Sequence, residues 1–171
     1  ILLLCAAIVY YQPTNTNTLT MSDFTAVASP ESISDETADV LHGPRPIAEV
    51  LADLRKPIPK RLLEQKPATG GRNAQMLTYC PWYRVQRILN HYTGGCCSYE
   101  VRERTVTGQH VLMTVRITIH AEERDFVRDG TGLERLDVSS YGDPQSNAES
   151  MAFRRAAARF GLGLHLYDGD D

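Results

Sequence analysis

Three arginines near the carboxyl end of the chain have the spacing to bind phosphate groups. Arg155 and Arg159 are four residues apart, so on a helix they share one face, while Arg154 projects from another side. No acidic residue follows Glu149 before Gly161, so these guanidiniums have no local partner. Two interpretations remain open: a solvated basic face on a surface helix, or a row of phosphate contacts, since the planar fork of Arg suits phosphate oxygens.

A second group of candidate residues is acidic. Glu122, Glu123 and Asp125 could hold a divalent metal for a nuclease, although a turn at the end of a strand explains them equally well. The chain has no Walker loop, H-E-x-x-H, EF-hand or G-x-S-x-G motif. We therefore expect a binding protein without catalytic residues, cofactor or bound metal.

The cysteines and the charge distribution narrow the class of protein further. The cysteines include no C-x-x-C pair, which argues against zinc and favours reduced thiols in a cytoplasmic protein. Residues 1–43 carry five acids and no Lys or Arg, and residues 168–171 carry three more acids. The 13 acids and 18 Lys and Arg of residues 44–167 leave a net charge of +5 there. Fifteen of those 18 cations are Arg, which favours an anionic partner.

The chain divides into an N-terminal segment, residues 1–43, and one domain, residues 44–171. The apolar run Ile1–Tyr11 is too short to span a bilayer, which needs about 20 residues. Since residues 1–20 open on Ile1 rather than Met, we interpret them as lying upstream of a true start at Met21. Residues 22–43 are acidic, rich in Ser and Thr and poor in large apolar groups, so we expect a disordered tail.

Hydrophobic spacing predicts the elements that position these residues. It indicates a helix from Pro46 to Arg55, a further helical turn over residues 60–65 that holds Lys60 and Arg61, and an extended segment, Leu77–Tyr79. A helix follows Pro81 and ends before Gly94.

From Ser98 the period of the pattern changes to two, which predicts strands. The first contains Tyr99–Arg104, the turn is Thr107–Gln109, and Val111–Ile119 is a half-buried strand. A third strand is expected in two pieces, Glu123–Arg128 and Glu134–Tyr141, around the glycines of residues 129–132. The predicted fold is α+β: a three-stranded antiparallel β-meander packed with helices on one face.

The last helix has both ends marked in the sequence. Ser146 and Glu149 have the spacing of a capping box, and Gly161 and Gly163 supply the left-handed turn that ends the helix. Phe153, Ala156 and Phe160 share one face, which we expect to pack on the core.

These motifs resemble the Rad52 family of single-strand DNA annealing proteins, in its smaller bacterial and phage form (DdrA-like or Sak-like). The resemblance covers residues 50–167 and is carried by three stretches: Ala148–Tyr167 with its basic pair and Phe-Gly, Tyr79–Gly94, and Arg135–Gly142. It implies a β-β-β-α core, a ring or helical homo-oligomer, and ATP-independent annealing of single-stranded DNA in recombination and repair.

The resemblance also implies which residues contact DNA. The family's basic pair falls on Arg154 and Arg155, and its groove-lining aromatic and basic positions fall on Tyr79 and Arg84. A third basic position falls on Ala158, with Arg159 next to it. No Lys stands at the hairpin turn, and residues 143–146 replace a basic segment found before the helix in some members, which suggests a groove with fewer contacts.

Further candidates for DNA contacts come from the residues themselves, and they include Lys60 and Arg61 in the predicted turn over residues 60–65. Arg102, Arg104 and Arg116 lie on the meander, where Arg102 and Arg104, two apart, are expected to share a face; a solvated sheet face explains them equally well. A double-stranded RNA-binding module has the same element order, but its last helix begins with Lys residues, unlike Ser146–Glu149. The acidic residues 22–43 could contact a single-strand-binding protein or mimic DNA, and a soluble tether explains them equally well.

Overall fold

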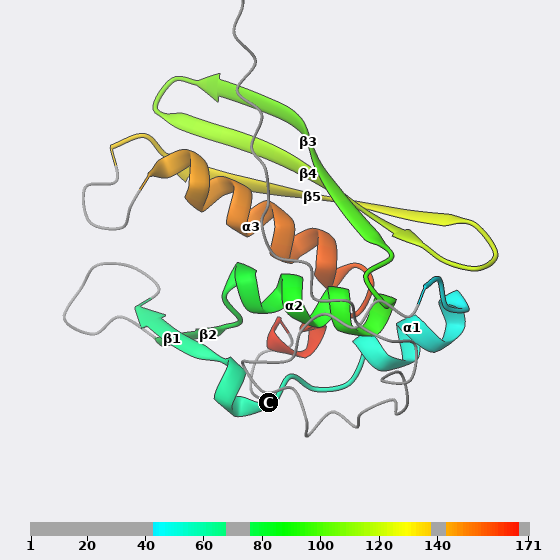
Figure 1. Ribbon diagram of the computed structural model, residues 1–171. Coiled ribbons are helices and arrows are strands. Elements are labelled where there is room, and N and C mark those ends of the chain that lie inside the picture. Colours follow the sequence, from blue (N-terminus) through cyan, green and yellow to red (C-terminus); the bar gives the residue numbers. More distant parts are fainter. Residues whose placement is uncertain (1–42, 68–75, 138–142, 168–171) are drawn as a thin grey trace, which may run out of the picture. The chain divides into compact units, whose positions relative to one another are not determined.

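The computed structural model describes residues 43–67, 76–137 and 143–167 (Figure 1). The predicted acidic tail and the segment before Met21 therefore lie outside the described residues, apart from Gly43. The elements in chain order are α1 (Ile47–Leu54), the 3₁₀ turn η2 (Lys60–Leu62), β1 (Glu64–Pro67), β2 (Met76–Tyr79), α2 (Trp82–Thr93), β3 (Cys97–Thr107), β4 (His110–His120), β5 (Asp125–Arg135), α3 (Pro144–Ala158) and the 3₁₀ turn η3 (Leu164–Leu166).

The three long strands form the antiparallel meander that the alternating pattern predicts, in the order β3-β4-β5. Thr107 pairs with His110 across the tight turn at Gly108, whose φ of 57° suits glycine. In β4 every second residue from Val111 to Ile119 is buried, so one face of the sheet packs on the core. The prediction of an α+β fold with a helix-covered meander is confirmed.

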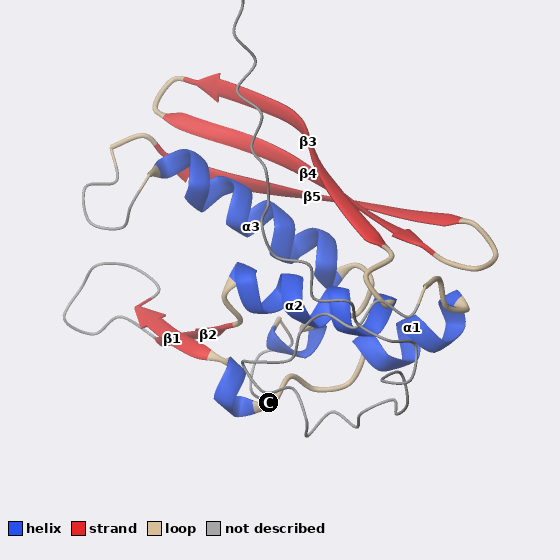
Figure 2. Ribbon diagram, viewed as in Figure 1, coloured by secondary structure: helices blue, strands red, loops and turns tan. Residues whose placement is uncertain are grey.

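Helix α3 lies along the sheet, with α2 on its other side and α1 next to α2 (Figures 1 and 2). Phe153, Ala156 and Phe160 are buried in the core, as predicted, together with residues of β4 and of α1 and α2. Among the described residues, no helix is long and apolar enough to cross a membrane.

Strand β5 differs from the prediction, because it runs through residues 129–132 without a break. The two glycines there are required by the approach of α3 rather than by a turn. A Cβ on Gly130 would lie 2.2 Å from the carbonyl oxygen of Ala152, and one on Gly132 would lie 1.9 Å from that of Ala148. Glycine and alanine thus let the backbones of α3 and β5 touch. Residues 138–141 of the second predicted piece lie outside the described residues.

The N-terminus of α3 also differs from the prediction. Asp143, not Ser146, is the N-cap, and its carboxylate accepts hydrogen bonds from the backbone N–H groups of Gln145 and Ser146. The helix starts at Pro144, whose fixed φ suits the first helical position, so the predicted capping box at Ser146 and Glu149 is wrong. After Ala158 the chain turns through Gly161 and Gly163, both with positive φ, as predicted.

A two-stranded antiparallel ribbon, β1 with β2, is the further sheet of the described residues. It pairs Glu64 with Tyr79 and Lys66 with Leu77. The extended segment at Leu77–Tyr79 is confirmed. The helical turn predicted over residues 60–65 ends at Leu62, because Glu64–Pro67 instead pairs with β2.

Candidate nucleic-acid interface

Arg154 is partly buried on the side of α3 that faces the β1–β2 ribbon. Its guanidinium lies over the ring of Tyr79, 5.5 Å from the ring centroid. Burial lowers the pKa of Arg154, because partial removal from water disfavours the charged form. Among the described residues no carboxylate pairs with it, so Arg154 is a desolvated cation whose charge an incoming anion would stabilise.

A hollow of about 260 Å³ opens next to Arg154, and we call it the tyrosine hollow. Two aromatic side chains and three basic ones are among the residues that line it: Tyr79, Tyr167, Lys66, Arg154 and Arg155. The ribbon brings Lys66 to within 5.3 Å of the Tyr79 ring centroid. Cys80 also lines the hollow, and burial raises the pKa of its thiol to about 11, so it is neutral at physiological pH.

The carboxylate of Glu64 on β1 binds polar side chains of β2 and α2. The hydroxyl of Tyr79 donates to it over 3.0 Å and that of Tyr83 over 3.4 Å, while Arg84 forms a salt bridge to it at 3.3 Å. Desolvation raises the pKa of Tyr79, and the bond to Glu64 raises it further, so its hydroxyl stays protonated. Arg84, which the resemblance places near the groove, lies in this cluster with an acidic partner and does not line the tyrosine hollow, so its contact with DNA stays a prediction.

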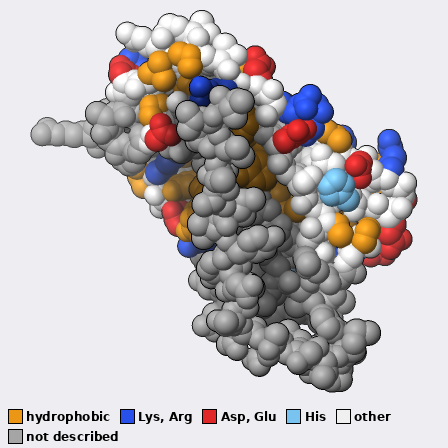
Figure 3. All heavy atoms as spheres, turned by 45° about the horizontal axis from the view of Figure 1, so that its top comes forward, with side chains coloured by type: hydrophobic (Ala, Val, Ile, Leu, Met, Phe, Trp, Pro, Cys, Tyr) orange, Lys and Arg blue, Asp and Glu red, His pale blue; other side chains and the backbone are white. Residues whose placement is uncertain are grey.

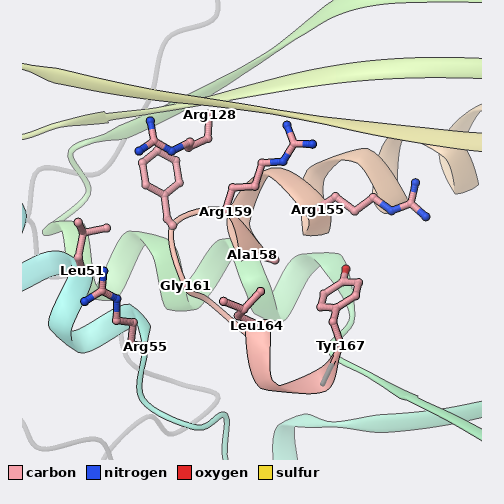
Figure 4. A pocket seen from close by; sticks show the side chains of 10 residues that line it. Leu51, Arg55, Arg128, Arg155, Ala158, Arg159, Gly161, Leu164 and Tyr167 are labelled. Carbon is pink, nitrogen blue, oxygen red and sulfur yellow. The ribbon is translucent and has the colours of Figure 1, made fainter. Parts of the chain in front are cut away.

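Arg155 and Arg159 lie together on the β5 side of α3, as their spacing predicts. Arg155 donates to the carbonyl of Thr131 over 2.7 Å, and Arg159 donates to the carbonyl of Asp129. Both line a second hollow of about 400 Å³, which we call the arginine hollow (Figure 4). Arg155 and Tyr167 line both hollows, so the two hollows adjoin.

Two further arginines of the arginine hollow, Arg55 and Arg128, were not predicted. Arg55 follows α1 and Arg128 lies on β5. Only the fold brings them beside Arg159, and no local pattern around either residue marks it as part of a site. Lys66 and Tyr167 were missed as well, although Tyr167 closes the stretch on which the resemblance rests.

The three arginines predicted on the meander, Arg102, Arg104 and Arg116, line neither hollow. Arg116 forms a two-pronged bond to Asp129, at 2.8 and 2.9 Å, and Arg102 pairs with Glu100 at 3.1 Å. The face shown in Figure 3 likewise carries basic and acidic side chains next to each other. The guanidiniums of Arg102 and Arg116 thus have acidic partners of their own.

Arg104 points to the other side of the sheet and donates to Gln145 over 2.9 Å. The register shifts between Val101 and Glu103, so Arg102 is the extra residue of a bulge and the alternation reverses after it. The prediction that Arg102 and Arg104 share a face is therefore wrong. Lys60 and Arg61 are exposed on η2 and line neither hollow.

The acidic residues considered for a nuclease are used elsewhere. Glu123 accepts the backbone N–H of Ile47 over 3.1 Å, and Asp125 bonds to His120 over 2.8 Å. Within the described ranges, no group of three or more His, Cys, Asp or Glu side chains could hold a metal ion. The positions of Glu122, Glu123 and Asp125 therefore do not support a metal site.

Comparison with known proteins gives two relatives from Arabidopsis thaliana. The chain is 40% identical over 128 residues to DNA repair RAD52-like protein 1, mitochondrial, a match that covers 74% of this chain and 70% of that protein. It is 37% identical over 126 residues to DNA repair RAD52-like protein 2, chloroplastic, covering 72% of this chain and 61% of that protein. No family profile matches the chain.

Proposed function

Because this chain belongs to the family of RAD52-like DNA repair proteins, we propose that it binds single-stranded DNA and anneals complementary strands in repair and recombination. The observation that carries the proposal is the state of Arg154. It is partly buried, lies over Tyr79, has no carboxylate partner among the described residues, and is next to Arg155 in an open hollow. A phosphate group is an anion that fits such a site.

The two hollows suit a single strand better than a duplex. Arg154, Arg155 and Lys66 supply charge for the phosphates, and Tyr167 supplies a ring on which a base can stack whatever its sequence. Tyr167 is 58% exposed, so its ring is accessible to a base. Strand annealing makes and breaks no covalent bond, so we propose that the protein acts without catalysis and without ATP.

Self-assembly is the second part of the proposal, because one subunit binds few phosphates and several subunits together bind many. Strand β3 offers a surface for it. Tyr99, Val101 and Val106 lie on the face of the sheet that α3 covers over β4 and β5, yet they are 49, 44 and 55% exposed. Next to them, a hollow of about 270 Å³ is lined by Trp82, Tyr99 and Phe153, among others. We propose that a second copy of the chain covers this face.

The decisive experiment is a titration of fluorescein-labelled oligo-dT with the wild type and with Arg154→Gln/Arg155→Gln at several salt concentrations. Each phosphate neutralised on a single strand contributes about −0.7 to the slope of log K against log salt, so removal of both guanidiniums should flatten the slope by about 1.4 per subunit. The matched control is Arg102→Gln/Arg135→Gln, which removes the same charge from two exposed acid-paired arginines. If Arg154→Gln/Arg155→Gln has the same affinity and salt slope as its control, the proposal that Arg154 and Arg155 bind the phosphates of the strand is refuted.

Annealing itself is measured with complementary oligonucleotides in the absence of ATP. An unlabelled duplex RNA competitor tests the alternative of a double-stranded RNA-binding module, and added magnesium tests for cleavage. Preferential competition by the duplex would refute a single-strand function. The bacterial or phage subtype, the cytoplasmic location and a single-strand-binding protein as partner stay predictions.

A further inference from the structure

The arginine hollow gathers four guanidiniums from three parts of the chain. Arg155 and Arg159 come from α3 and the residue after it, Arg128 from β5, and Arg55 from the end of α1 (Figure 4). None of the described residues that line it is acidic. Four cations around one open space repel one another, so the arrangement favours an anion in that space.

Each of these side chains is oriented by the protein, which lowers the entropy lost when an anion binds. Arg155, Arg159 and Arg128 each donate to one backbone carbonyl, of Thr131, Asp129 and Val127 respectively. The guanidinium of Arg128 also lies 5.5 Å from the ring centroid of the buried Phe160. A guanidinium has several N–H donors, so one carbonyl bond leaves the others for a phosphate oxygen.

Arg55 is the fourth arginine of the hollow, and its side chain packs against Gly161. A Cβ on Gly161 would come within 2.7 Å of Cγ of Arg55, so the stem of Arg55 lies directly against the turn that follows α3. Gly161 has a φ of 108°. In Figure 4 the Arg55 and Arg155 side chains lie at opposite ends of the hollow, with Arg128 and Arg159 between them. The four arginines thus extend along the hollow from one end to the other.

The residues at the end of α3 show how this hollow relates to the proposed strand path. Ala158, where the family resemblance places a third basic residue, is only 6% exposed. The neighbouring Arg159 is exposed and turns toward β5 and the arginine hollow. Because Arg155 and Tyr167 line both hollows, a strand held by Arg154 and Arg155 can continue into the second one.

We infer that the arginine hollow is a second phosphate-binding station on the same single strand, formed by Arg55, Arg128 and Arg159 and joined to the first by Arg155. This inference rests on the proposed function. It assigns DNA contacts to Arg55 and Arg128, and it moves the third basic contact of α3 from the Ala158 position to Arg159. The strand then crosses each subunit from Tyr79 to Arg128.

The test is the variant Arg55→Gln/Arg128→Gln, which leaves the first hollow intact. Because two guanidiniums no longer neutralise phosphates in this variant, its salt slope should be flatter than that of the wild type by about 1.4 per subunit. Between roughly 50 mM and 200 mM salt, wild-type affinity should then fall about sevenfold more than variant affinity. With an oligo-dT so short that it fills the tyrosine hollow alone, the wild type and Arg55→Gln/Arg128→Gln should have the same salt slope.

The companion variant Arg55→Lys/Arg128→Lys keeps both charges and separates charge from packing. It should retain the wild-type slope, and equal flattening in the Lys and Gln variants would overturn the inference. A wild-type slope in the Gln variant overturns it as well, provided the wild type binds the strand. If the wild type does not bind single-stranded DNA, or Arg154→Gln/Arg155→Gln binds normally, the proposed function fails, and the inference with it.

Discussion

Substitution of Gly132 by Ala tests the contact that fixes α3 on the sheet. The added Cβ would lie 1.9 Å from the carbonyl oxygen of Ala148 and 2.9 Å from the backbone nitrogen of Ala152. Real Cβ atoms essentially never come within 3.0 Å of such atoms, so the two backbones must separate by about 1 Å. The obstacle is helix backbone, which cannot move aside as the end of a side chain can.

The expected cost follows from that displacement. Overpacking of a tight contact costs about 1–3 kcal/mol, and the backbone clash places this substitution at the upper end. The Ala variant gains about 0.4–1 kcal/mol from its less flexible unfolded chain. We expect a net loss of about 2 kcal/mol in the free energy of unfolding, because Ala148 and Ala152 also lose close packing.

The measurement is urea unfolding followed by circular dichroism at one fixed protein concentration, since self-association would shift the midpoint. The control is Leu133→Ala on the same strand, where the side chain is 49% exposed and the loss should stay below about 1 kcal/mol. The same shift moves Thr131 away from Arg155, so single-strand affinity should fall although no charge changes. A Gly132→Ala variant as stable as the control would refute the close approach of α3.

Three other variants test the site, the helix cap and the assembly. Glu64→Gln should raise single-strand affinity roughly two- to fivefold, because it releases Arg84 and removes a negative charge beside Tyr79; weaker binding would contradict the role given to Glu64. Backbone N–H bonds from Ser146 hold the pKa of Asp143 below its usual value, so the stability it contributes is present at neutral pH and is lost as pH falls. Asp143→Asn, which can still cap, should make the unfolding free energy less sensitive to pH between about 5 and 2, and equal sensitivity would count against this cap. Val101→Lys/Val106→Lys should reduce the assembly measured by native mass spectrometry, whereas Val127→Lys on the opposite face of the sheet should leave it unchanged.

The elements predicted correctly are those whose pattern of apolar residues lies within one short stretch of the sequence. Alternation along Val111–Ile119 fixes both the strand and its buried face, because side chains in a strand alternate by geometry. Helical spacing in the same way predicted the buried face of α3 and the common side of Arg155 and Arg159. In each case the residues that make the structure are neighbours in the sequence.

The predictions that were wrong depend on distant or competing contacts. In isolation, Gly130-Thr-Gly132 is a turn signal, and only the small residues that α3 places above it make a continuous strand possible. Ser146 and Glu149 do have capping-box spacing, but Asp143 followed by Pro144 caps the helix three residues earlier. The bulge at Arg102 reverses the alternation within β3 and could not be read from the alternation itself.

Strand β5 explains why the arginines of α3 are so well placed for an anion. Within the described residues it pairs with β4 alone, so no described strand pairs with its other edge, where the carbonyls of Asp129 and Thr131 accept bonds from Arg159 and Arg155. Gly130 and Gly132 alternate with those two residues and bring the helix close enough for the arginines to reach the carbonyls.

Arg155 and Arg159 therefore have both a structural role at the sheet edge and a place in the arginine hollow. They satisfy backbone groups at a sheet edge, which protects that edge from pairing with another strand, and they line the arginine hollow. Lysine would supply equal charge, but its ammonium lacks the rigid fork that bonds a carbonyl with one N–H group and a phosphate with the others. The distance between the backbones of α3 and β5 determines where each guanidinium lies, so the close approach of the helix is what lets Arg155 and Arg159 reach both the carbonyls and the hollow.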